Sequence, residues 1–242
     1  MTHGPLVDLA EVPPWMRTLV SATTELDSDL FRQASSYDPG KAREAAVLIL
    51  LGEAESNAVA SDGAANPDVL LLLRADGLGS HAGQVAFPGG VADEGDGGPV
   101  GTALREATEE TGLLPEGAHP VALLPRLYVP VSGFLVTPVV AHWRTPCPVR
   151  AVDPAETAAV ARVPLAHLAD PANRFRVRHA SGFAGPAFAV PGMLVWGLTA
   201  ALLSLVISLG GWDRAWDADD VRDLDEAWRS SGVQRGAKGM SS

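Results

Sequence analysis

Apolar runs alternate with polar, glycine-rich segments along most of the chain. Residues 45–51 (AAVLILL) and 68–74 (DVLLLLR) are apolar at nearly every position, which is typical of strands buried on both faces of a sheet. Residues 52–67, between them, are mostly small and polar, with glycine and proline, so we expect a surface loop there. Residues 84–90 (QVAFPGG) predict a short strand that ends in a Pro-Gly-Gly turn.

The same pattern predicts the remaining elements. Strands are expected at residues 120–129, 133–143 and 157–165, and an exposed edge strand at residues 173–179, where basic and apolar residues alternate. Helices are expected as two short elements within residues 12–36, the first beginning at Pro13-Pro14, and then at residues 100–111, 197–209 and 217–231, with a frayed tail from residue 232.

Mixed strands and helices without an obvious linker predict one α/β domain. We place this domain at residues 41–210. A helical extension is expected at residues 1–40, and a C-terminal helix with a flexible tail at residues 211–242.

One uncharged segment, residues 192–211, has about the 20 residues that a membrane-spanning helix needs. Glycines stand near both of its ends, no Lys/Arg cluster flanks it, and a helix over residues 197–209 would be only about 20 Å long. We therefore expect a buried core helix and no membrane association. The N-terminus also lacks the pattern of a signal peptide.

Composition limits the classes of molecule that the protein is expected to bind. The formal net charge is -11, from 18 Lys+Arg against 29 Asp+Glu, so most of the surface would repel a nucleic acid polymer. Small anionic ligands can still bind where a metal ion or a local basic patch makes the local charge positive. The single cysteine, Cys147, rules out an internal disulfide and fits a reducing cytoplasm. Oligomeric state is left open, with a homodimer as one alternative.

The segment REATEETGL, residues 105–113, concentrates charge on a predicted helix. Glu106, Glu109 and Glu110 stand at positions i, i+3 and i+4, so they share a face and repel one another. A hard divalent cation removes that repulsion, because Mg²⁺ and Mn²⁺ prefer carboxylate oxygens. Arg105 stands four residues before Glu109 and can orient its carboxylate. A solvated acidic helix face is the alternative for this segment taken alone.

The surroundings of the helix favour the metal site. The predicted strand 84–90 runs into Gly89 and Gly90, where the backbone can approach a ligand closely. An acidic loop with Asp93 and Asp96 follows and leads onto the helix. The two aspartates would position a metal or cap the helix, and the sequence does not separate these roles.

Residues 90–113 resemble the Nudix box, the loop–helix signature of a superfamily that hydrolyses nucleoside diphosphates linked to other groups. The matching positions are Arg105, Glu106, Ala107, Glu109, Glu110, Gly112 and Leu113. The loop is one residue longer than the commonest form, and Asp96 stands near the usual place of a glutamate. The resemblance implies a Nudix-type α/β/α sandwich with a mixed sheet.

A longer loop with aspartates is similar to the coenzyme A pyrophosphatase branch. The upstream signature of that branch is met by Leu70, Leu71, Arg74, Ala75, Gly83, Phe87, Pro88, Gly89 and Gly90. Leu72 replaces a threonine, and Gly79 stands where a second arginine is expected. Further matching segments, at residues 132–140, 156–168 and 195–203, extend the resemblance over residues 43–210.

The resemblance implies a reaction and the residues for it. The enzyme would hydrolyse the pyrophosphate linkage of coenzyme A or its thioesters to 3',5'-ADP and (acyl-)phosphopantetheine, with Mg²⁺ or Mn²⁺. Glu106 and Glu110 would be metal ligands. Glu109 would be a third ligand or the residue that handles a metal-bound water. Arg105 would orient the carboxylates, and a carbonyl of Gly89 or Gly90 could add a ligand.

Weaker candidates lie elsewhere. Arg74 and His81 are candidate phosphate contacts, with a surface ion pair and a hydrogen-bonded loop histidine as their respective alternatives. Glu156 is either a further ligand or base, or a surface carboxylate. Rival functions are a Nudix hydrolase of ADP-ribose or NADH, which Gly79 keeps open, and a non-catalytic Nudix-fold binding module.

Overall fold

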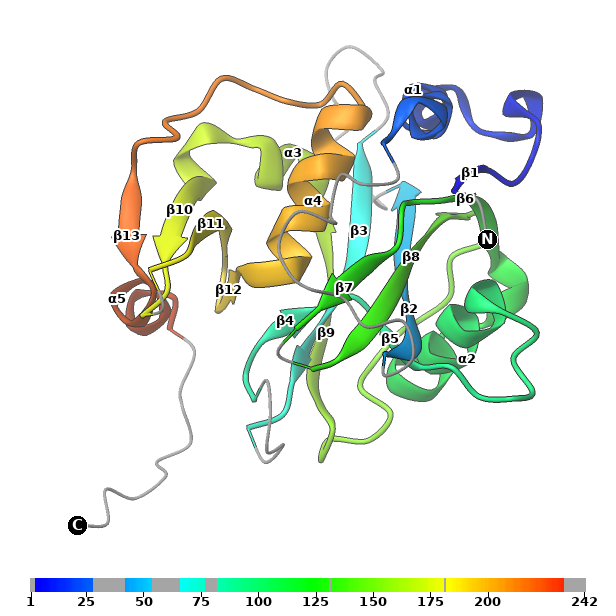
Figure 1. The fold of residues 1–242 in the computed structure, drawn as a ribbon, viewed down its shortest axis with the longest axis horizontal. Helices are drawn as coiled ribbons and strands as arrows, with labels where there is room; N and C mark the ends of the chain where they lie inside the picture. Colours follow the sequence, from blue (N-terminus) through cyan, green and yellow to red (C-terminus); the bar gives the residue numbers. More distant parts are fainter. Residues whose placement is uncertain are drawn as a thin grey trace.

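Two β-sheets and the helices packed around them make up the computed structural model (Figure 1). The structure describes residues 3–27, 42–53, 66–76, 82–130, 132–180 and 182–232. The larger sheet contains β1 (Gly4–Pro5), β2 (Arg43–Glu53), β3 (Pro67–Arg74), β4 (Val85–Ala86), β5 (Gly89–Val91), β6 (Ala118–Leu123), β7 (Leu127–Val129), β8 (Phe134–Trp143) and β9 (Thr157–Pro164). The smaller sheet contains β10 (Arg174–Arg178), β11 (Ala184–Val190), β12 (Met193–Val195) and β13 (Val221–Asp223).

The helices lie between and outside these strands in the chain. They are α1 (Arg17–Ala22), α2 (Pro99–Thr111), α3 (Leu165–Ala169), α4 (Gly197–Leu209) and α5 (Leu224–Ser230). Short 3-10 segments are found at Leu9–Glu11, Pro14–Met16, Thr23–Glu25, Pro115–Gly117 and Pro171–Asn173.

The central strand β2 gives the larger sheet its mixed character and an opening at one edge. It pairs parallel with β8 along its length on one side. On the other side, Ala45–Val47 pairs antiparallel with β5, whereas Leu51–Glu53 pairs antiparallel with β3. Two strands therefore share one edge of β2 and diverge from each other, and β5 turns toward α2. The predicted α/β class with a mixed sheet is confirmed.

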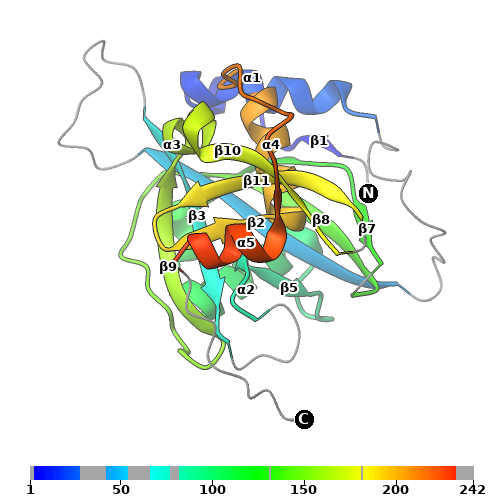
Figure 2. The same cartoon turned by 90° about the vertical axis from the view of Figure 1, so that its left-hand side faces the viewer.

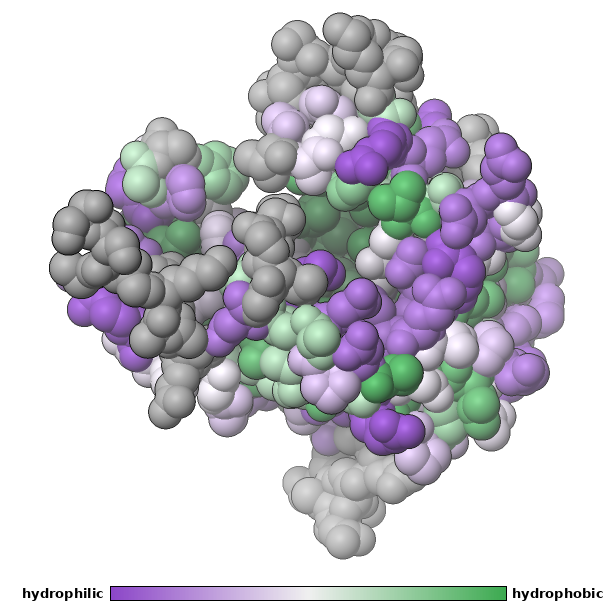
Figure 3. Space-filling model, turned by 90° about the horizontal axis from the view of Figure 1, so that it is seen from below, coloured by the Kyte–Doolittle hydropathy of each residue, from purple (hydrophilic) through white to green (hydrophobic). Residues whose placement is uncertain are grey.

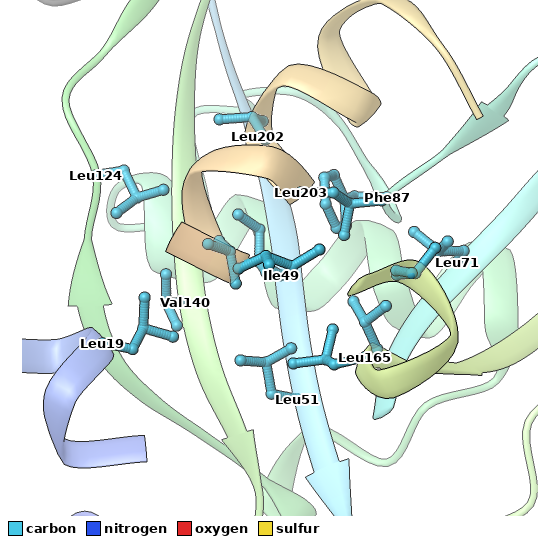
Figure 4. Close-up of a cluster of buried hydrophobic side chains, with 14 of the residues drawn as sticks. Leu19, Ile49, Leu51, Leu71, Phe87, Leu124, Val140, Leu165, Leu202 and Leu203 are labelled. Atoms are coloured by element: carbon cyan, nitrogen blue, oxygen red, sulfur yellow. The ribbon is translucent and has the colours of Figure 1, made fainter. Parts of the chain in front are cut away.

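Strand β2 is buried on both faces, as predicted for residues 45–51. Ala46, Leu48 and Leu50 point to the layer that contains α2, with Ala103 and Ala107. Ile49 and Leu51 point to the opposite layer, where α4 supplies Leu202 and Leu203, as Figure 4 shows. Each of these leucine and isoleucine side chains contributes about 1.5–3 kcal/mol when fully buried. The sheet is thus fixed between two helical layers.

Helix α4 matches the expected bounds 197–209 and is a core element. Its side chains Leu202, Leu203 and Val206 are fully buried. No helix in the described ranges is long and apolar enough to cross a membrane. The apolar character of this segment therefore reflects burial between the two sheets.

The smaller sheet differs from the sequence expectation. Its order is β12-β11-β10-β13, so residues 173–179 form an internal strand, and their prediction as an exposed edge strand is wrong. The reason is that residues 221–223 pair parallel with β10. The predicted helix 217–231 is accordingly wrong in its first half. Helix α5 begins at Leu224, where the Asp223 side chain accepts a hydrogen bond from the amide of Glu226.

Other boundaries also shift. The single strand predicted at residues 120–129 is split into β6 and β7, which both pair with β8, and Pro125 lies between them. The first N-terminal helix is confirmed as a 3-10 turn at Pro14–Met16 that continues into α1. The second falls mostly on residues 28–36, outside the described residues, as do most of loop 52–67 and the tail from residue 233.

The division into residues 1–40, 41–210 and 211–242 stays a prediction. Met16 and Leu19 from the first range pack in the same core cluster as α4. Trp228 from the last range packs on Phe175 and Val177 of β10. Figure 2 shows β10, β11 and α5 in front of β2 and β3. Side chains of all three ranges therefore take part in buried clusters.

Candidate functional site

Helix α2 presents two carboxylates to the glycine turn. The helix begins at Pro99, a residue suited to a first helical position, and ends at Gly112, whose φ of 69° is left-handed. Glu106 and Glu110 are four residues apart and hence on one face. Their side chains are 17% and 11% exposed, which is low for glutamates. This face is directed toward β5 rather than into solvent.

Strand β5 meets these carboxylates closely. The Gly89 amide donates a hydrogen bond of 2.9 Å to Oε2 of Glu110. A Cβ atom at Gly90 would collide with the carboxylate of Glu106, and one at Gly89 would collide with the Ala46 carbonyl. A side chain at Gly89 would therefore clash with backbone, and one at Gly90 would displace the Glu106 carboxylate. The turn, the strand and the helix converge as the sequence suggested.

Arg105 connects the acidic groups around this point. Its Nε and Nη2 atoms donate to the two carboxylate oxygens of Asp96 at 2.8 and 3.1 Å. Its Nη1 atom lies 3.0 Å from both Glu106 Oε1 and Glu109 Oε2, and Nη2 also donates to the Val91 carbonyl at 2.9 Å. The guanidinium thus ties the helix to the preceding loop and to the end of β5.

Asp96 is the main anchor of Arg105. Its side chain is 5% exposed and also accepts a hydrogen bond from the Asp93 amide. The hydrogen bond from Arg105 holds the pKa of Asp96 far below its usual range and raises the pKa of Arg105. Asp96 is therefore ionised at neutral pH and fixes the arginine from the loop side. The sequence offered positioning or capping for this aspartate and did not identify its arginine partner.

Burial raises the pKa of both buried glutamates. The pKa of Glu110 is raised to about 7 by desolvation, which the Gly89 amide and the Arg74 charge oppose and the Glu106 and Glu156 charges reinforce. The pKa of Glu106 is raised chiefly by desolvation, against the nearby charge of Arg105. Binding of a proton or of a cation therefore stabilises these two desolvated carboxylates.

A divalent metal fits the chemistry of this donor set. Among the described residues, no group of three or more His, Cys, Asp or Glu side chains is arranged as a preformed metal cage. The site instead offers Glu106 and Glu110, which are desolvated, lie against β5 and carry hard oxygen donors. Mg²⁺ is commonly held by one or two carboxylates together with substrate phosphates, so a pair of this kind is sufficient.

Two further charged residues, Arg74 and Glu156, act on this site. Arg74, at the end of β3, places Nη1 3.9 Å from Glu110 Oε1, and its buried Nε has no hydrogen-bond partner among the described residues. The charge of Glu156 acts on Glu110, and its carbonyl accepts a hydrogen bond from the Ala75 amide. His81 and Gly79 lie outside the described residues.

One face of the molecule is hollowed. Seen from below, the molecule has a recess with hydrophobic surface at its floor and hydrophilic groups around it (Figure 3). A recess of mixed character suits a ligand with both charged and apolar parts.

Comparison with known proteins identifies a family. The family profile described as "NUDIX domain" matches residues 43–181. The chain is 46% identical over 100 residues to the uncharacterized Nudix hydrolase NudL of Cronobacter sakazakii, which covers 41% of this chain and 51% of that protein. It is 38% identical over 137 residues to the NudL of Shigella flexneri, covering 57% of this chain and 65% of that protein. The chain thus spans about half to two thirds of the length of these relatives.

A solved structure overlaps with the chain more loosely. The Nudix hydrolase RenU of M. smegmatis has a TM-score of 0.48 and 18% sequence identity, and the match covers 72% of this chain and 89% of that one.

Proposed function

Because the chain belongs to the Nudix family, we propose that it is a metal-dependent hydrolase of the pyrophosphate linkage in a nucleoside diphosphate derivative. The observation that carries this proposal is the pair of desolvated carboxylates, Glu106 and Glu110, held against Gly89 and Gly90. We further propose coenzyme A or its thioesters as the substrate, from the resemblance of residues 70–90 to the signature of that branch.

Each residue has a proposed task in the reaction. Glu106 and Glu110 would hold Mg²⁺ or Mn²⁺, which when bound neutralises the anionic linkage and lowers the pKa of water. The Gly89 amide keeps Glu110 in place, and a carbonyl of Gly89 or Gly90 would complete the donor set. Arg105 fixes Glu106 and Glu109 through its anchor on Asp96.

Glu109 and Arg74 would act on the reactants. The Glu109 side chain is 58% exposed, so it can accept the proton of the attacking water. The water oxygen forms a bond to phosphorus, and the bond from that phosphorus to the bridging oxygen breaks, which gives two phosphate monoesters. Arg74 carries a positive charge beside Glu110 and would bind a phosphate oxygen of the substrate.

The test is product analysis with purified protein and Mg²⁺ or Mn²⁺. Coenzyme A, acetyl-coenzyme A, ADP-ribose and NADH are compared for wild type, Glu110→Gln and the exposed control Glu116→Gln. We expect coenzyme A to be cleaved fastest, a loss of at least about 100-fold in kcat for Glu110→Gln, and no change for Glu116→Gln.

Other outcomes separate the rival functions. A preference for ADP-ribose or NADH would retain the hydrolase and reject coenzyme A. Metal binding without turnover of any of the four compounds would favour a non-catalytic binding module. Equal activity of wild type and Glu110→Gln would reject the proposed site.

A further inference from the structure

A second cavity lies on the other side of the β3–β4 pair. It has a volume of about 270 Å³ and opens between the start of β4, the end of β10 and helix α5. Its lining includes Gln84, Arg178, His179, Trp196, Asp225 and Trp228. Ligand pockets for small molecules usually occupy about 300–1,000 Å³, so this cavity suits one ring system rather than a whole cofactor.

Aromatic rings form one wall of the cavity. The rings of His179 and Trp196 lie nearly parallel, with centroids 6.2 Å apart and an interplanar angle of 16°. Trp228 meets Trp196 edge to face, with centroids 6.1 Å apart. The buried Nε1 of Trp196 has no hydrogen-bond acceptor among the described residues, although a buried indole usually finds one. Such a wall favours a flat heteroaromatic ligand.

Charged groups stand at the edge of this aromatic wall. Arg178, the last residue of β10, is exposed and also lines the cavity. Two carboxylates line the same cavity: Asp223, which caps α5 and stands opposite Arg178 in the β10–β13 pair, and Asp225, on the first turn of α5. A guanidinium binds phosphate through paired hydrogen bonds, and a carboxylate accepts from an exocyclic amino group. The combination matches a phosphorylated nucleoside better than a purely apolar ligand.

The cavity is structurally joined to the candidate active site. The Arg74 amide donates to the Gln84 carbonyl at 2.9 Å, and the Gly83 amide donates to the Arg74 carbonyl at 3.1 Å. A Cβ at Gly83 would lie 3.2 Å from Cζ2 of Trp228, so α5 packs directly on this turn. Strand partners of this kind have Cα atoms about 5 Å apart. One wall of the cavity is therefore the immediate neighbour of the arginine that faces Glu110.

We propose that this cavity binds the nucleobase end of the nucleoside diphosphate substrate, with the base stacked on Trp196 and Arg178 in contact with a phosphate on the ribose. The inference rests on the proposed function, whose substrate it specifies. Trp196 and α5 lie outside residues 43–181, so part of the wall of this cavity comes from a segment that the family profile does not match, whereas Arg178 lies within the matched range. Arg178 would also supply a cation for a phosphate-rich substrate, where Gly79 replaces one.

The first test is ligand binding without metal, measured by calorimetry in EDTA. Adenosine 3',5'-bisphosphate and adenosine are compared on wild type, Arg178→Ala, Trp196→Leu and Arg144→Ala. Arg144 is also an exposed arginine and lies just beyond the end of β8, which pairs with β2 and not with the smaller sheet. We expect wild type to bind the bisphosphate about tenfold more tightly than adenosine, because only the bisphosphate offers phosphate oxygens to Arg178.

The variants should separate the contribution of the phosphate contact from that of base stacking. Arg178→Ala should abolish the preference for the bisphosphate and leave adenosine binding unchanged, whereas Trp196→Leu should weaken both ligands similarly. Arg144→Ala should behave as wild type. Arg178 is exposed, so its variant stays informative even if Trp196→Leu fails to fold. Absence of bisphosphate binding to wild type, or an undiminished preference in Arg178→Ala, would overturn the proposal.

Kinetics separate this proposal from the proposed function. If both hold, Arg178→Ala raises KM about tenfold with kcat nearly unchanged, and Glu110→Gln lowers kcat without changing bisphosphate affinity. Hydrolysis by wild type with KM insensitive to Arg178 would overturn the cavity assignment alone. Arg178-dependent bisphosphate binding without hydrolysis of any pyrophosphate compound would support the nucleotide site and overturn the hydrolase.

Discussion

At the scale of single residues, the candidate site depends on one arginine shared among several oxygens. Arg105 contacts Asp96, Glu106, Glu109 and the Val91 carbonyl, and each of these contacts is 3.1 Å or shorter. The contact with Asp96 uses two nitrogens of the rigid guanidinium, which a lysine ammonium cannot reproduce. Geometry, beyond charge alone, therefore sets the positions of Glu106 and Glu109.

Arg105→Lys tests this role. The substitution keeps the charge and removes the two-nitrogen contact with Asp96, so we expect kcat to fall about tenfold with a smaller change in KM. Steady-state kinetics on the preferred substrate would measure it. Arg126→Lys is the control, because Arg126 forms an exposed ion pair with Glu44 at 3.6 Å, which contributes little. Unchanged kinetics in Arg105→Lys would show that charge alone suffices.

Glu110 predicts a pH dependence of stability in the metal-free protein. Its pKa is raised from 4.5 to about 7, so the folded state holds the proton more tightly than the unfolded state. Below pH 4.5 both states are protonated and the residue contributes nothing. As the pH rises from 4.5 to about 7, the unfolded state releases this proton while the folded state keeps it, so the free energy of unfolding falls by up to about 3 kcal/mol and then levels off.

Glu110→Gln should remove this dependence. Urea unfolding in EDTA between pH 4.5 and 8 would compare wild type with the variant, and we expect the wild type to lose stability relative to Glu110→Gln as the pH rises. Parallel stability curves would contradict the raised pKa. Added Mg²⁺ should restore wild-type stability at pH 8, and have less effect on the variant.

At the scale of elements, β5 and α2 approach so closely that the Glu106 carboxylate lies against the Cα of Gly90. Gly90→Ala would place a methyl group where this carboxylate lies, so the Glu106 side chain must move from its position. We expect at least about a tenfold loss in kcat/KM, because displacements near 1 Å suffice for large effects on catalysis. Gly95→Ala, in the following loop, has no heavy atom within 4 Å of the new methyl group and should remain active. Equal activity of both variants would contradict this contact.

Local sequence patterns predicted the elements that have a continuous apolar run or a regular spacing of charged residues. The apolar runs of β2, β3 and α4 and the carboxylate spacing of α2 follow from burial and helical periodicity, and so does the approach of Glu106 and Glu110 to the glycine turn. The smaller sheet was not predicted correctly. Residues 221–223 have the polar pattern of an amphipathic helix, and only their pairing with β10 makes them a strand. The contacts of Arg105 with Asp96 and of Arg74 with Glu110 depend on loop closure and strand register, which one sequence does not encode locally.

At the scale of the whole molecule, α4 connects both sheets through one core. The cluster around it contains Ile49 and Leu71 from the larger sheet and Phe188 and Val195 from the smaller sheet. Leu203, also on α4, is fully buried in this cluster. The two sheets therefore share this apolar cluster, and we expect them to unfold together.

Leu203→Ala tests this shared core. Removal of a fully buried leucine side chain should cost about 2–5 kcal/mol of unfolding free energy. Denaturant unfolding followed by tryptophan fluorescence and by far-UV circular dichroism should give coincident transitions at the lower midpoint. Leu114→Ala, at a side chain that is 59% exposed, should change stability little. Separate transitions by the two probes would instead indicate independently folding sheets.

The parallel pairing of β13 with β10 has an evolutionary consequence. The proposed metal ligands and the glycines of the candidate site lie between residues 89 and 110, whereas β13 and α5 line the second cavity with residues between 223 and 228. Mutations in this late segment can reshape one wall of the cavity without touching the residues that would perform hydrolysis. If both proposals hold, changes in substrate range and conservation of the chemistry would map largely to separate stretches of the gene.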